Sequence, residues 1–368
     1  MGTRIRRRRT GGALLVAAAA AVAGLNAALG DGAGGGPDAA QLSIRELVGE
    51  RLVAGFAGRH PPGALLARIR RGDLVGVVLF SDNFADRADA RRLIRRLQAI
   101  RRPPGLRDPL LVMVDQEGGV VKRLPGAPFA SAEQMGRHGP AFSRRQGRLT
   151  ARNLAAAGIG VDLAPVLDLG RPGGAIRGEH RSFASSAGQV SATAVPFALG
   201  LQSGGVAATA KHFPGFGAAA VNTDVGVARI ALPAQTLRRL DEAPFRRFAK
   251  AGGRLVMMSS AIYPAFSERP AVFARPVATA ELRDRLGFEG VAISDSLGAA
   301  AVRAFGGPAR VARAAAAAGT DLLLFTGYRA AARADEALRA ALRSGALRRD
   351  DFVASAQRVL DLRAALAR

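Results

Sequence analysis

Eight short apolar runs, separated by segments of helical length, constrain the fold of this chain more than any other feature. Each run ends in polar or Gly-rich residues, and the eight runs are residues 52–56, 76–80, 110–114, 161–166, 206–210, 255–258, 290–293 and 321–325. Uninterrupted apolar runs of this length are typical of strands that are buried on both faces of a parallel sheet. The segments between them are rich in Ala, Arg and Leu, and Gly158 and Gly319 stand where two of these predicted helices would end.

Eight alternations of strand and helix predict an α/β fold of the (β/α)8 TIM-type barrel, formed as a single domain. The alternative is an open, doubly wound sheet, but no G-x-G-x-x-G motif opens a helix after the first predicted strand. The folded part begins with a capping-box pattern at Ser43-Ile44-Arg45-Glu46. We therefore assign residues 41–368 to the barrel.

The first forty residues differ in composition from the rest of the chain. A basic run from Arg4 to Arg9 precedes an Ala-rich apolar stretch from Ala13 to Leu29, which is the pattern of a secretory signal peptide or an uncleaved membrane anchor. We assign residues 1–30 to this segment and residues 31–40 to a Gly-rich linker. The protein is therefore expected to be exported, either secreted or associated with the cell envelope, and to meet the membrane only through its N-terminal segment.

The charge and the rare residue types limit the partners of the protein. The net charge of +24 comes almost entirely from Arg residues that are scattered over the predicted helices, Trp is absent and Tyr occurs only twice. Because stacked bases need an aromatic platform, we expect no specific nucleic-acid partner, and we expect attraction to anionic cell-wall polymers instead. With no Cys, only four His and no His-x-His or H-E-x-x-H pattern, we expect neither a metal nor a cofactor.

Ionisable side chains follow several of the predicted strands. Asp115, Asp168 and Asp295 come after the third, fourth and seventh runs, and Lys211-His212 comes after the fifth. A single Asp in such a place is often only a helix N-cap, but the carboxyl ends of barrel strands converge on one mouth, where these groups would meet. Carboxylates accept hydrogen bonds from sugar hydroxyls, while Lys and His donate to them. The sequence therefore predicts a site for an uncharged, polyhydroxylated substrate, that is, a carbohydrate.

An ordered set of motifs resembles glycoside hydrolase family 3, and in particular its single-domain bacterial β-N-acetylhexosaminidases. The motifs are Asp115-Gln116-Glu117-Gly118-Gly119 with Lys122-Arg123, Asp162-Leu163-Ala164-Pro165-Val166-Leu167-Asp168, Arg181-Ser182-Phe183, Lys211-His212-Phe213-Pro214-Gly215-Phe216-Gly217 and Ser294-Asp295-Ser296-Leu297. The resemblance implies a retaining exo-glycosidase that releases terminal β-linked N-acetylglucosamine, including that of peptidoglycan fragments. It implies that Asp295 is the nucleophile of a covalent glycosyl-enzyme. It further implies that the sugar hydroxyls are bound by Asp115, Arg123, Arg181, Lys211 and His212.

One loop departs from the family pattern. In the family it reads P-G-H-G and then D-S-H, whose Asp and His form the general acid/base pair, whereas this chain has Phe216 and then Asn222-Thr223-Asp224. We expect Asp224 to be the acid/base, because a carboxylic acid whose pKa is raised by burial is a sound proton donor. Glu179 and His180 are the alternatives, and a plain solvent-exposed turn at 222–224 fits the residue types equally well. A β-glucosidase or β-xylosidase on the same scaffold, and a cell-wall glycan-binding protein with impaired catalysis, remain open.

Overall fold

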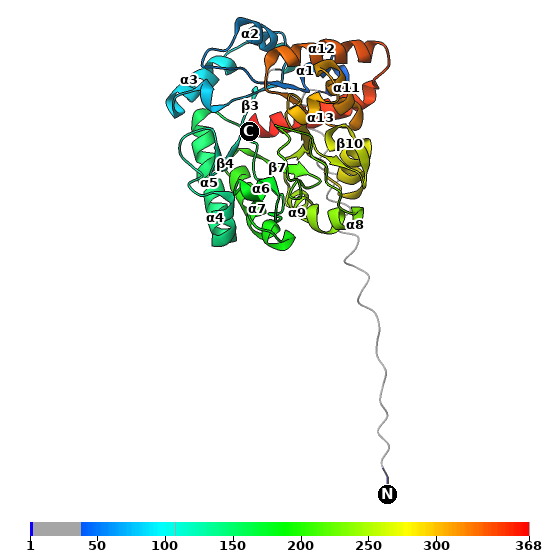
Figure 1. Cartoon of the computed structure of the whole chain (residues 1–368). Helices are drawn as coiled ribbons and strands as arrows, with labels where there is room; N and C mark the ends of the chain where they lie inside the picture. The colour runs from blue at the N-terminus through cyan, green and yellow to red at the C-terminus, as the bar shows by residue number, and fades with distance from the viewer. Residues whose placement is uncertain (3–37, 107, 368) are drawn as a thin grey trace. The chain divides into compact units, whose positions relative to one another are not determined.

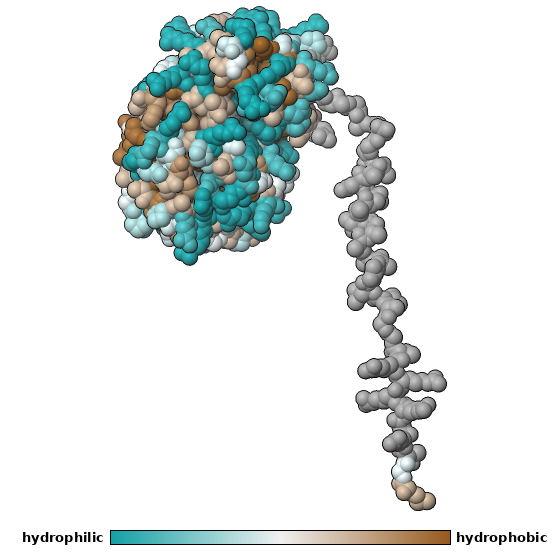
Figure 2. Space-filling model, turned by 90° about the vertical axis from the view of Figure 1, so that its right-hand side faces the viewer, coloured by the Kyte–Doolittle hydropathy of each residue, from teal (hydrophilic) through white to brown (hydrophobic). Residues whose placement is uncertain are grey.

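The computed structural model describes residues 1–2, 38–106 and 108–367. Residues 38–106 and 108–367 belong to one compact unit. Nearly all of the predicted leader and linker lies outside the described residues. None of the helices in the described part of the chain combines the length and the hydropathy needed to cross a bilayer. Hydrophilic side chains cover much of the face of the molecule in Figure 2.

Eight parallel strands form the central sheet, and each predicted apolar run supplies one of them. The strands are β1 (Leu52–Ala54), β2 (Gly76–Val78), β3 (Leu111–Val114), β6 (Val161–Asp162), β7 (Ala207–Phe213), β8 (Leu255–Met258), β11 (Val291–Ser294) and β12 (Leu323–Phe325). Their order is β11-β8-β7-β6-β3-β2-β1-β12. A parallel bridge between Ile293 and Leu322 joins the two end strands into a ring. The prediction of a (β/α)8 barrel is confirmed.

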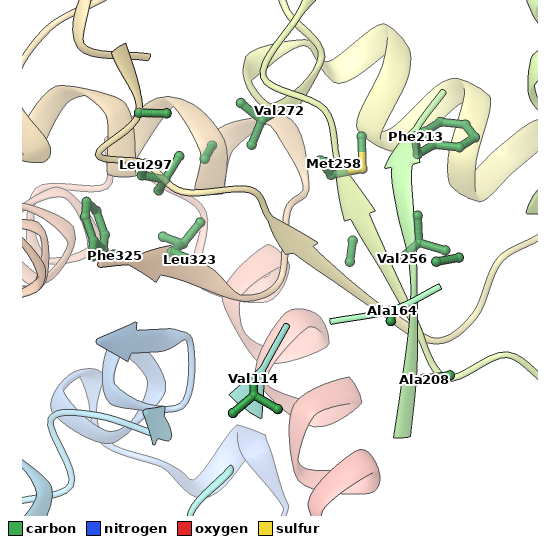
Figure 3. Packing of buried hydrophobic residues seen from close by; sticks show 14 of the residues in the cluster. Val114, Ala164, Ala208, Phe213, Val256, Met258, Val272, Leu297, Leu323 and Phe325 are labelled. Carbon is green, nitrogen blue, oxygen red and sulfur yellow. The ribbon is translucent and has the colours of Figure 1, made fainter. Parts of the chain in front are cut away.

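Alternate residues of each strand enter two different hydrophobic clusters, as the period of two along a strand requires. On β8, Val256 and Met258 belong to the larger cluster, which also holds the side chains of the outer helices. Figure 3 shows these two residues near Phe213 of the neighbouring strand. Leu255 and Met257 belong instead to a smaller cluster, which consists of strand residues and of residues of the C-terminal helix. Burial on both faces explains why the runs are apolar throughout.

Helices surround the barrel, most of them on its outside (Figure 1). They are α1 (Ile44–Gly49), α2 (Gly63–Arg70), α3 (Arg87–Gln98), α4 (Ala132–His138), α5 (Pro140–Ala157), α6 (Ala175–Gly178), α7 (Ala187–Gln202), α8 (Ala234–Thr236), α9 (Ala243–Lys250), α10 (Ala300–Arg303), α11 (Pro308–Ala318), α12 (Tyr328–Arg343) and α13 (Arg349–Ala367). In Figure 1, α3, α5, α7 and α9 follow one another around the sheet. The capping box at Ser43 and Glu46 begins α1, and α5 and α11 end in left-handed residues at Gly158 and Gly319, as predicted.

The C-terminal helix α13 covers the end of the barrel at which the strands begin. Val359 and Leu362 of this helix belong to the interior cluster. Its Arg363 forms a fully buried ion pair at 2.6 Å with Glu50, which lies just before β1. The opposite end, where the strands finish, is therefore the end that is left for a site.

Candidate active site

A cavity of about 230 Å³ is lined by residues at the carboxyl ends of the strands. It brings together all seven side chains predicted to bind or cleave a sugar, namely Asp115, Arg123, Arg181, Lys211, His212, Asp224 and Asp295. Its other polar lining residues are Glu179, Asn222, Thr223, Ser259, Ser296 and Thr326. Nothing in the sequence indicated that Thr326 lies at this site. The seven predicted residues come from segments that are far apart in the sequence, and the closed barrel brings these segments together.

A small antiparallel hairpin follows β3. Asp115 lies directly before this hairpin and Arg123 directly after it. Its strands are β4 (Gln116–Gly118) and β5 (Val121–Lys122). The buried amide of Gln116 stabilises the connection, because Nε2 donates to the carbonyl of Leu124 at 2.7 Å and Oε1 accepts from the backbone N–H of Arg123 at 3.0 Å. Arg123 thus has a fixed backbone position beside the cavity.

An ion cluster forms one wall of the cavity. Arg181 donates to both carboxylate oxygens of Glu117 at 2.8 Å, and its third nitrogen donates to Glu179 at 2.8 Å. The ammonium of Lys211 lies 2.7 Å from Asp115 Oδ1 and 2.6 Å from Glu117 Oε1. The cluster fixes two cationic donors at the cavity, Arg181 and Lys211, and two of its three carboxylates, Asp115 and Glu179, also line the cavity.

The charges in this cluster support one another. Burial alone would raise the pKa of Glu117, but the positive charges of Lys211 and Arg181 outweigh it and hold the pKa at about 2. Burial likewise lowers the pKa of Lys211, yet Asp115 and Glu117 raise it above its ordinary value. Arg123 lies 3.9 Å from Asp115. The cluster therefore contains equal numbers of acidic and basic side chains, namely Asp115, Glu117 and Glu179 with Arg123, Arg181 and Lys211. Such a neutral set of fixed donors and acceptors suits the hydroxyl groups of an uncharged sugar.

Asp168 fixes the position of His212. It is fully buried, accepts from the backbone N–H groups of His212 at 3.1 Å and Phe216 at 2.6 Å, and lies 2.7 Å from His212 Nδ1. A carboxylate on Nδ1 orients the ring and leaves Nε2 free for another partner. The ring of Phe216 packs edge-on against that of His212, with centroids 5.6 Å apart.

The predicted nucleophile, Asp295, directly follows β11 and lines the cavity. Its Oδ1 accepts from the backbone N–H of Ser296 at 2.7 Å. Within residues 38–106 and 108–367, no cationic side chain forms an ion pair with Asp295. Asp295 differs in this respect from Asp115, which two basic side chains hold.

The predicted acid/base, Asp224, lies in the loop between β7 and α8, at the edge of the cavity. The Asn222 side chain caps this turn by accepting from the backbone N–H of Asp224 at 3.0 Å. Burial raises the pKa of the Asp224 carboxyl, and the negative charge of Asp295 raises it further, against the smaller opposing effects of His212 and Arg181. The two carboxyl groups therefore influence each other across one cavity.

The two alternatives to Asp224 have different surroundings. Glu179 lines the cavity, but its carboxylate is engaged by Arg181 and accepts from Asn222 Nδ2 at 3.3 Å. His180 has a left-handed backbone, with φ of 55°, and its Nδ1 lies 2.6 Å from Glu133. It lines a neighbouring cavity of about 400 Å³ instead. Of these two residues, only Glu179 is among those that line the candidate active site.

Two residues at the centre of this arrangement received no role from the sequence. Glu117 is part of a family motif, and it stands two positions after Asp115. In an extended segment that spacing places both side chains on the same face. Asp168 was recognised as a strand-end carboxylate, but nothing local to the sequence indicates its contact with His212, 44 residues away.

Fold and site together define a barrel of the kind that holds its functional groups at the carboxyl ends of the strands. The chain matches the model of the glycosyl hydrolase family 3 N-terminal domain over residues 48–362. It belongs to glycosyl hydrolase family 3, and the resemblance inferred from the motifs is confirmed. Within the described residues, no group of three His, Asp or Glu side chains could hold a metal ion.

Three similar proteins place the chain within this family. It is 34% identical over 337 residues to an uncharacterized secreted glycosyl hydrolase of Arthroderma benhamiae, covering 89% of this chain and 95% of that protein. It is 38% identical over 264 residues to a beta-hexosaminidase of Alkalilimnicola ehrlichii, covering 69% and 74%. A solved family 3 beta-N-acetylglucosaminidase from Paenibacillus sp. str. FPU-7 superposes with a TM-score of 0.85 at 32% identity, covering 89% of this chain. The present chain spans only 63% of that Paenibacillus chain.

Proposed function

We propose that this protein is a retaining exo-glycosidase that releases terminal β-linked N-acetylglucosamine, with Asp295 as nucleophile and Asp224 as general acid/base. One observation carries the proposal. Four carboxylates line the cavity. Among the residues that the structure describes, basic side chains hold Asp115 and Glu179, whereas none forms an ion pair with Asp224 or Asp295. Paired carboxylates hold substrate in place, while two unpaired ones are what a retaining mechanism needs.

The proposed reaction has two steps. Asp295 attacks the anomeric carbon as the bond to the leaving oxygen breaks, and Asp224 gives its proton to that oxygen. In the second step Asp224 takes a proton from water, and the water oxygen displaces Asp295 with net retention. The raised pKa of Asp224 supports its part, because it must be protonated when the first step begins.

The remaining cavity residues are proposed to bind the sugar. Asp115, Arg123, Arg181, Lys211 and His212 would hold the hydroxyl groups of the ring, through hydrogen bonds that strengthen as the ring flattens toward the transition state. The choice of N-acetylglucosamine is supported by the relatives named beta-hexosaminidase and beta-N-acetylglucosaminidase. Peptidoglycan fragments are the proposed natural source of this sugar.

We also propose that the protein is exported, with residues 1–30 as leader or anchor, residues 31–40 as linker and residues 41–368 as the catalytic domain. The basic and apolar leader supports this, and so does the relative named as secreted. The net charge of +24 supports contact with anionic wall polymers.

The test is hydrolysis of 4-nitrophenyl β-glycosides of N-acetylglucosamine, glucose and xylose by the purified protein. We expect the N-acetylglucosaminide to have the highest kcat/KM. A faster glucoside or xyloside would replace the proposed sugar and keep the enzyme class. If the protein binds N-acetylglucosamine in calorimetry but hydrolyses none of the three, it is a glycan-binding protein and the proposal fails.

A further inference from the structure

The neighbouring cavity of about 400 Å³, here called the second cavity, has no part in the proposed reaction. One short stretch of chain, residues 177–182, borders both cavities. Glu179 and Arg181 line the candidate active site. Arg177, His180 and Ser182 line the second cavity instead. A group that leaves the candidate active site across this stretch therefore enters the second cavity directly.

The second cavity has a firmly packed wall. Helix α4 packs against α5 and α7 (Figure 1), and a side chain added at Gly136 of α4 would collide with the backbone of Phe183. The hydroxyl of Ser182 donates to the carbonyl of Asp168 at 2.7 Å. The wall is thus held between α4 and the chain at Asp168, the residue that also positions His212.

The charged side chains of the second cavity have a positive excess. They are Glu133, Arg137, Arg177 and His180. Glu133 forms an ion pair with Arg137, and its other oxygen lies 2.6 Å from His180 Nδ1. Within the part of the chain that the structure describes, Arg177 has no acidic partner. Two Arg side chains therefore face a single Glu, and protonation of His180 adds to the excess.

The candidate active site has the opposite balance. Four carboxylates line it, against two Arg and one Lys. Opposite charges attract and like charges repel, and both effects are stronger in a cavity than in open water. An anionic group of the substrate is therefore disfavoured beside Asp295 and favoured in the second cavity.

Hydrogen bonds connect the proposed acid/base to the border between the cavities. Asn222 accepts from the backbone N–H of Asp224, and its Nδ2 donates to Glu179 at 3.3 Å. The next residue, His180, lines the second cavity with a side chain that is 69% exposed. Since Asp224 is proposed to protonate the leaving oxygen, the group on that oxygen would lie beside Glu179 and His180. The second sugar of a substrate would thus stand at the entrance of the second cavity.

We propose that the second cavity binds a carboxylate carried by the second sugar of the substrate, through Arg137 and Arg177. The inference rests on the proposed function and deepens it, because it separates peptidoglycan fragments from uncharged glycans. In peptidoglycan the sugar that follows N-acetylglucosamine carries a lactyl ether, whose carboxyl group is free or bears a peptide with carboxylates of its own. Guanidinium groups bind carboxylates through paired N–H donors. The protein therefore selects fragments with an acidic second sugar over chains of N-acetylglucosamine alone.

The test compares one disaccharide in two forms. N-acetylglucosamine linked to N-acetylmuramic acid carries a free lactyl carboxylate, and its primary amide has nearly the same shape without the charge. We expect kcat/KM to be about 3- to 10-fold higher for the acid at low salt, as two partly exposed ion pairs would give. This preference should shrink as salt is added.

A second pair of compounds distinguishes the two sources of the carboxylate. It carries an alanyl-glutamate dipeptide on the lactyl group, with the glutamate carboxylates either free or amidated. A preference for the acid only in this pair assigns the contact to the peptide. A preference in the first pair assigns it to the lactyl group.

Matched variants change the charge of the second cavity. Arg137→Gln combined with Arg177→Gln should bring acid and amide within about twofold of each other and leave the nitrophenyl substrate within about twofold of wild type. Glu133→Gln removes the one acid of the cavity and should increase the preference. Arg91→Gln combined with Arg95→Gln, on the exposed face of α3, removes the same charge elsewhere and should leave the preference unchanged.

Equal kcat/KM values for acid and amide, in both pairs, would overturn the inference. So would a preference that survives the loss of both Arg side chains, or one that the α3 variant abolishes equally.

The proposed function is judged separately, by the nitrophenyl assay. If that assay shows no hydrolysis of the N-acetylglucosaminide, the proposed function has failed, and the second cavity is tested by itself. Calorimetry then compares N-acetylmuramic acid bearing the dipeptide, as acid and as amide, on wild type and on the double Arg variant. Tighter binding of the acid by wild type alone supports the inference, and equal binding of the two forms contradicts it.

Discussion

Both carboxylate oxygens of Glu117 accept hydrogen bonds from the guanidinium of Arg181, each at 2.8 Å. Arg181 lines the cavity, whereas Glu117 is almost completely buried and does not. The same carboxylate also contacts Lys211, at 2.6 Å. One buried acid thus positions two of the basic side chains that are proposed to bind the sugar.

Replacing Glu117 with Gln should destabilise the protein at neutral pH. Removing one partner of a buried ion pair costs about 3–5 kcal/mol where the other charge is left uncompensated. Because Lys211 and Arg181 keep Asp115 and Glu179 as partners, we expect a loss near the lower end of this range. Urea unfolding of the wild type and of Glu117→Gln measures the difference. The matched control is Glu268→Gln, which breaks the exposed pair with Arg229 and should leave the unfolding midpoint nearly unchanged. Equal effects of the two substitutions would contradict this assignment.

The same pair predicts a pH dependence of stability. The pKa of Glu117 is about 2 in the folded protein, below the ordinary value of 4.5. Because the folded state lowers this pKa, the stabilisation is present above about pH 4.5 and is lost as the pH falls toward about 2. The difference in unfolding free energy between wild type and Glu117→Gln should therefore be constant near neutrality and shrink below about pH 4.5. A difference that stays constant down to about pH 3 would show that the carboxylate charge is not its source.

The barrel could be predicted from the sequence because burial on both faces makes parallel strands uniformly apolar. The residues at which the strands end could not be predicted in this way. Lys211 and His212 were expected to follow a strand ending at Ala210, yet β7 continues to Phe213, with Lys211 and Phe213 pairing with Met257 and Met258. Backbone hydrogen bonds define a strand, and they continue where polar side chains face a cavity inside the barrel.

The part of the site that lies at strand ends could be predicted from the sequence. Residues at strand ends converge in any such barrel, so Asp115 and Asp295 could be placed from the sequence. The contact between Glu117 and Arg181 joins residues 64 positions apart, through a hairpin whose turn has positive φ at Gly118 and Gly119. No local pattern gives the spatial path of such a loop.

Asp295→Asn tests the nucleophile. The substitution keeps the shape of the side chain and its contact with the Ser296 N–H but removes the negative charge. We expect sugar binding within a few-fold of wild type and a fall in kcat of several orders of magnitude, because no covalent intermediate can form. In the wild type, a 2-deoxy-2-fluoro glycoside with a good leaving group should attach covalently to the peptide containing Asp295, as mass spectrometry would show. A label on another residue, or turnover by the variant, would exclude Asp295.

The positive charge should produce salt-sensitive binding to anionic wall polymers. Helices α3 and α5 pack side by side, and their exposed basic residues are Arg87, Arg91, Arg92, Arg95, Arg96, Arg144, Arg145, Arg148 and Arg152. We expect the protein to sediment with insoluble cell walls at low salt and to be released at about 0.5 M salt, where screening is strong. Tight DNA binding that resists the same salt would contradict a non-specific role for this charge.

Asp224→Asn tests the acid/base. If Asp224 protonates the leaving oxygen, glycosides of poorly acidic alcohols should slow by about 10²–10⁴-fold in the variant, because those alcohols need the proton to depart. Nitrophenyl glycosides should lose far less in the first step, since their leaving group departs largely unaided. Azide should then restore turnover of the nitrophenyl substrate by attacking the glycosyl-enzyme without base assistance, giving a β-glycosyl azide.

The pH profile gives an independent check on the same residue. The pKa of Asp224 is raised by burial and by the charge of Asp295, so the protonated form persists to higher pH than for an ordinary Asp. For wild type, kcat/KM on an alkyl glycoside should fall as the pH rises through this raised pKa, and Asp224→Asn should lose that limb. Asp295→Asn removes the neighbouring charge and should lower the pKa of Asp224, which carboxyl-carbon NMR can follow. If Asp224→Asn instead hydrolyses alkyl glycosides at the wild-type rate, the acid is another group, and Glu179, which also lines the cavity, is the next residue to replace.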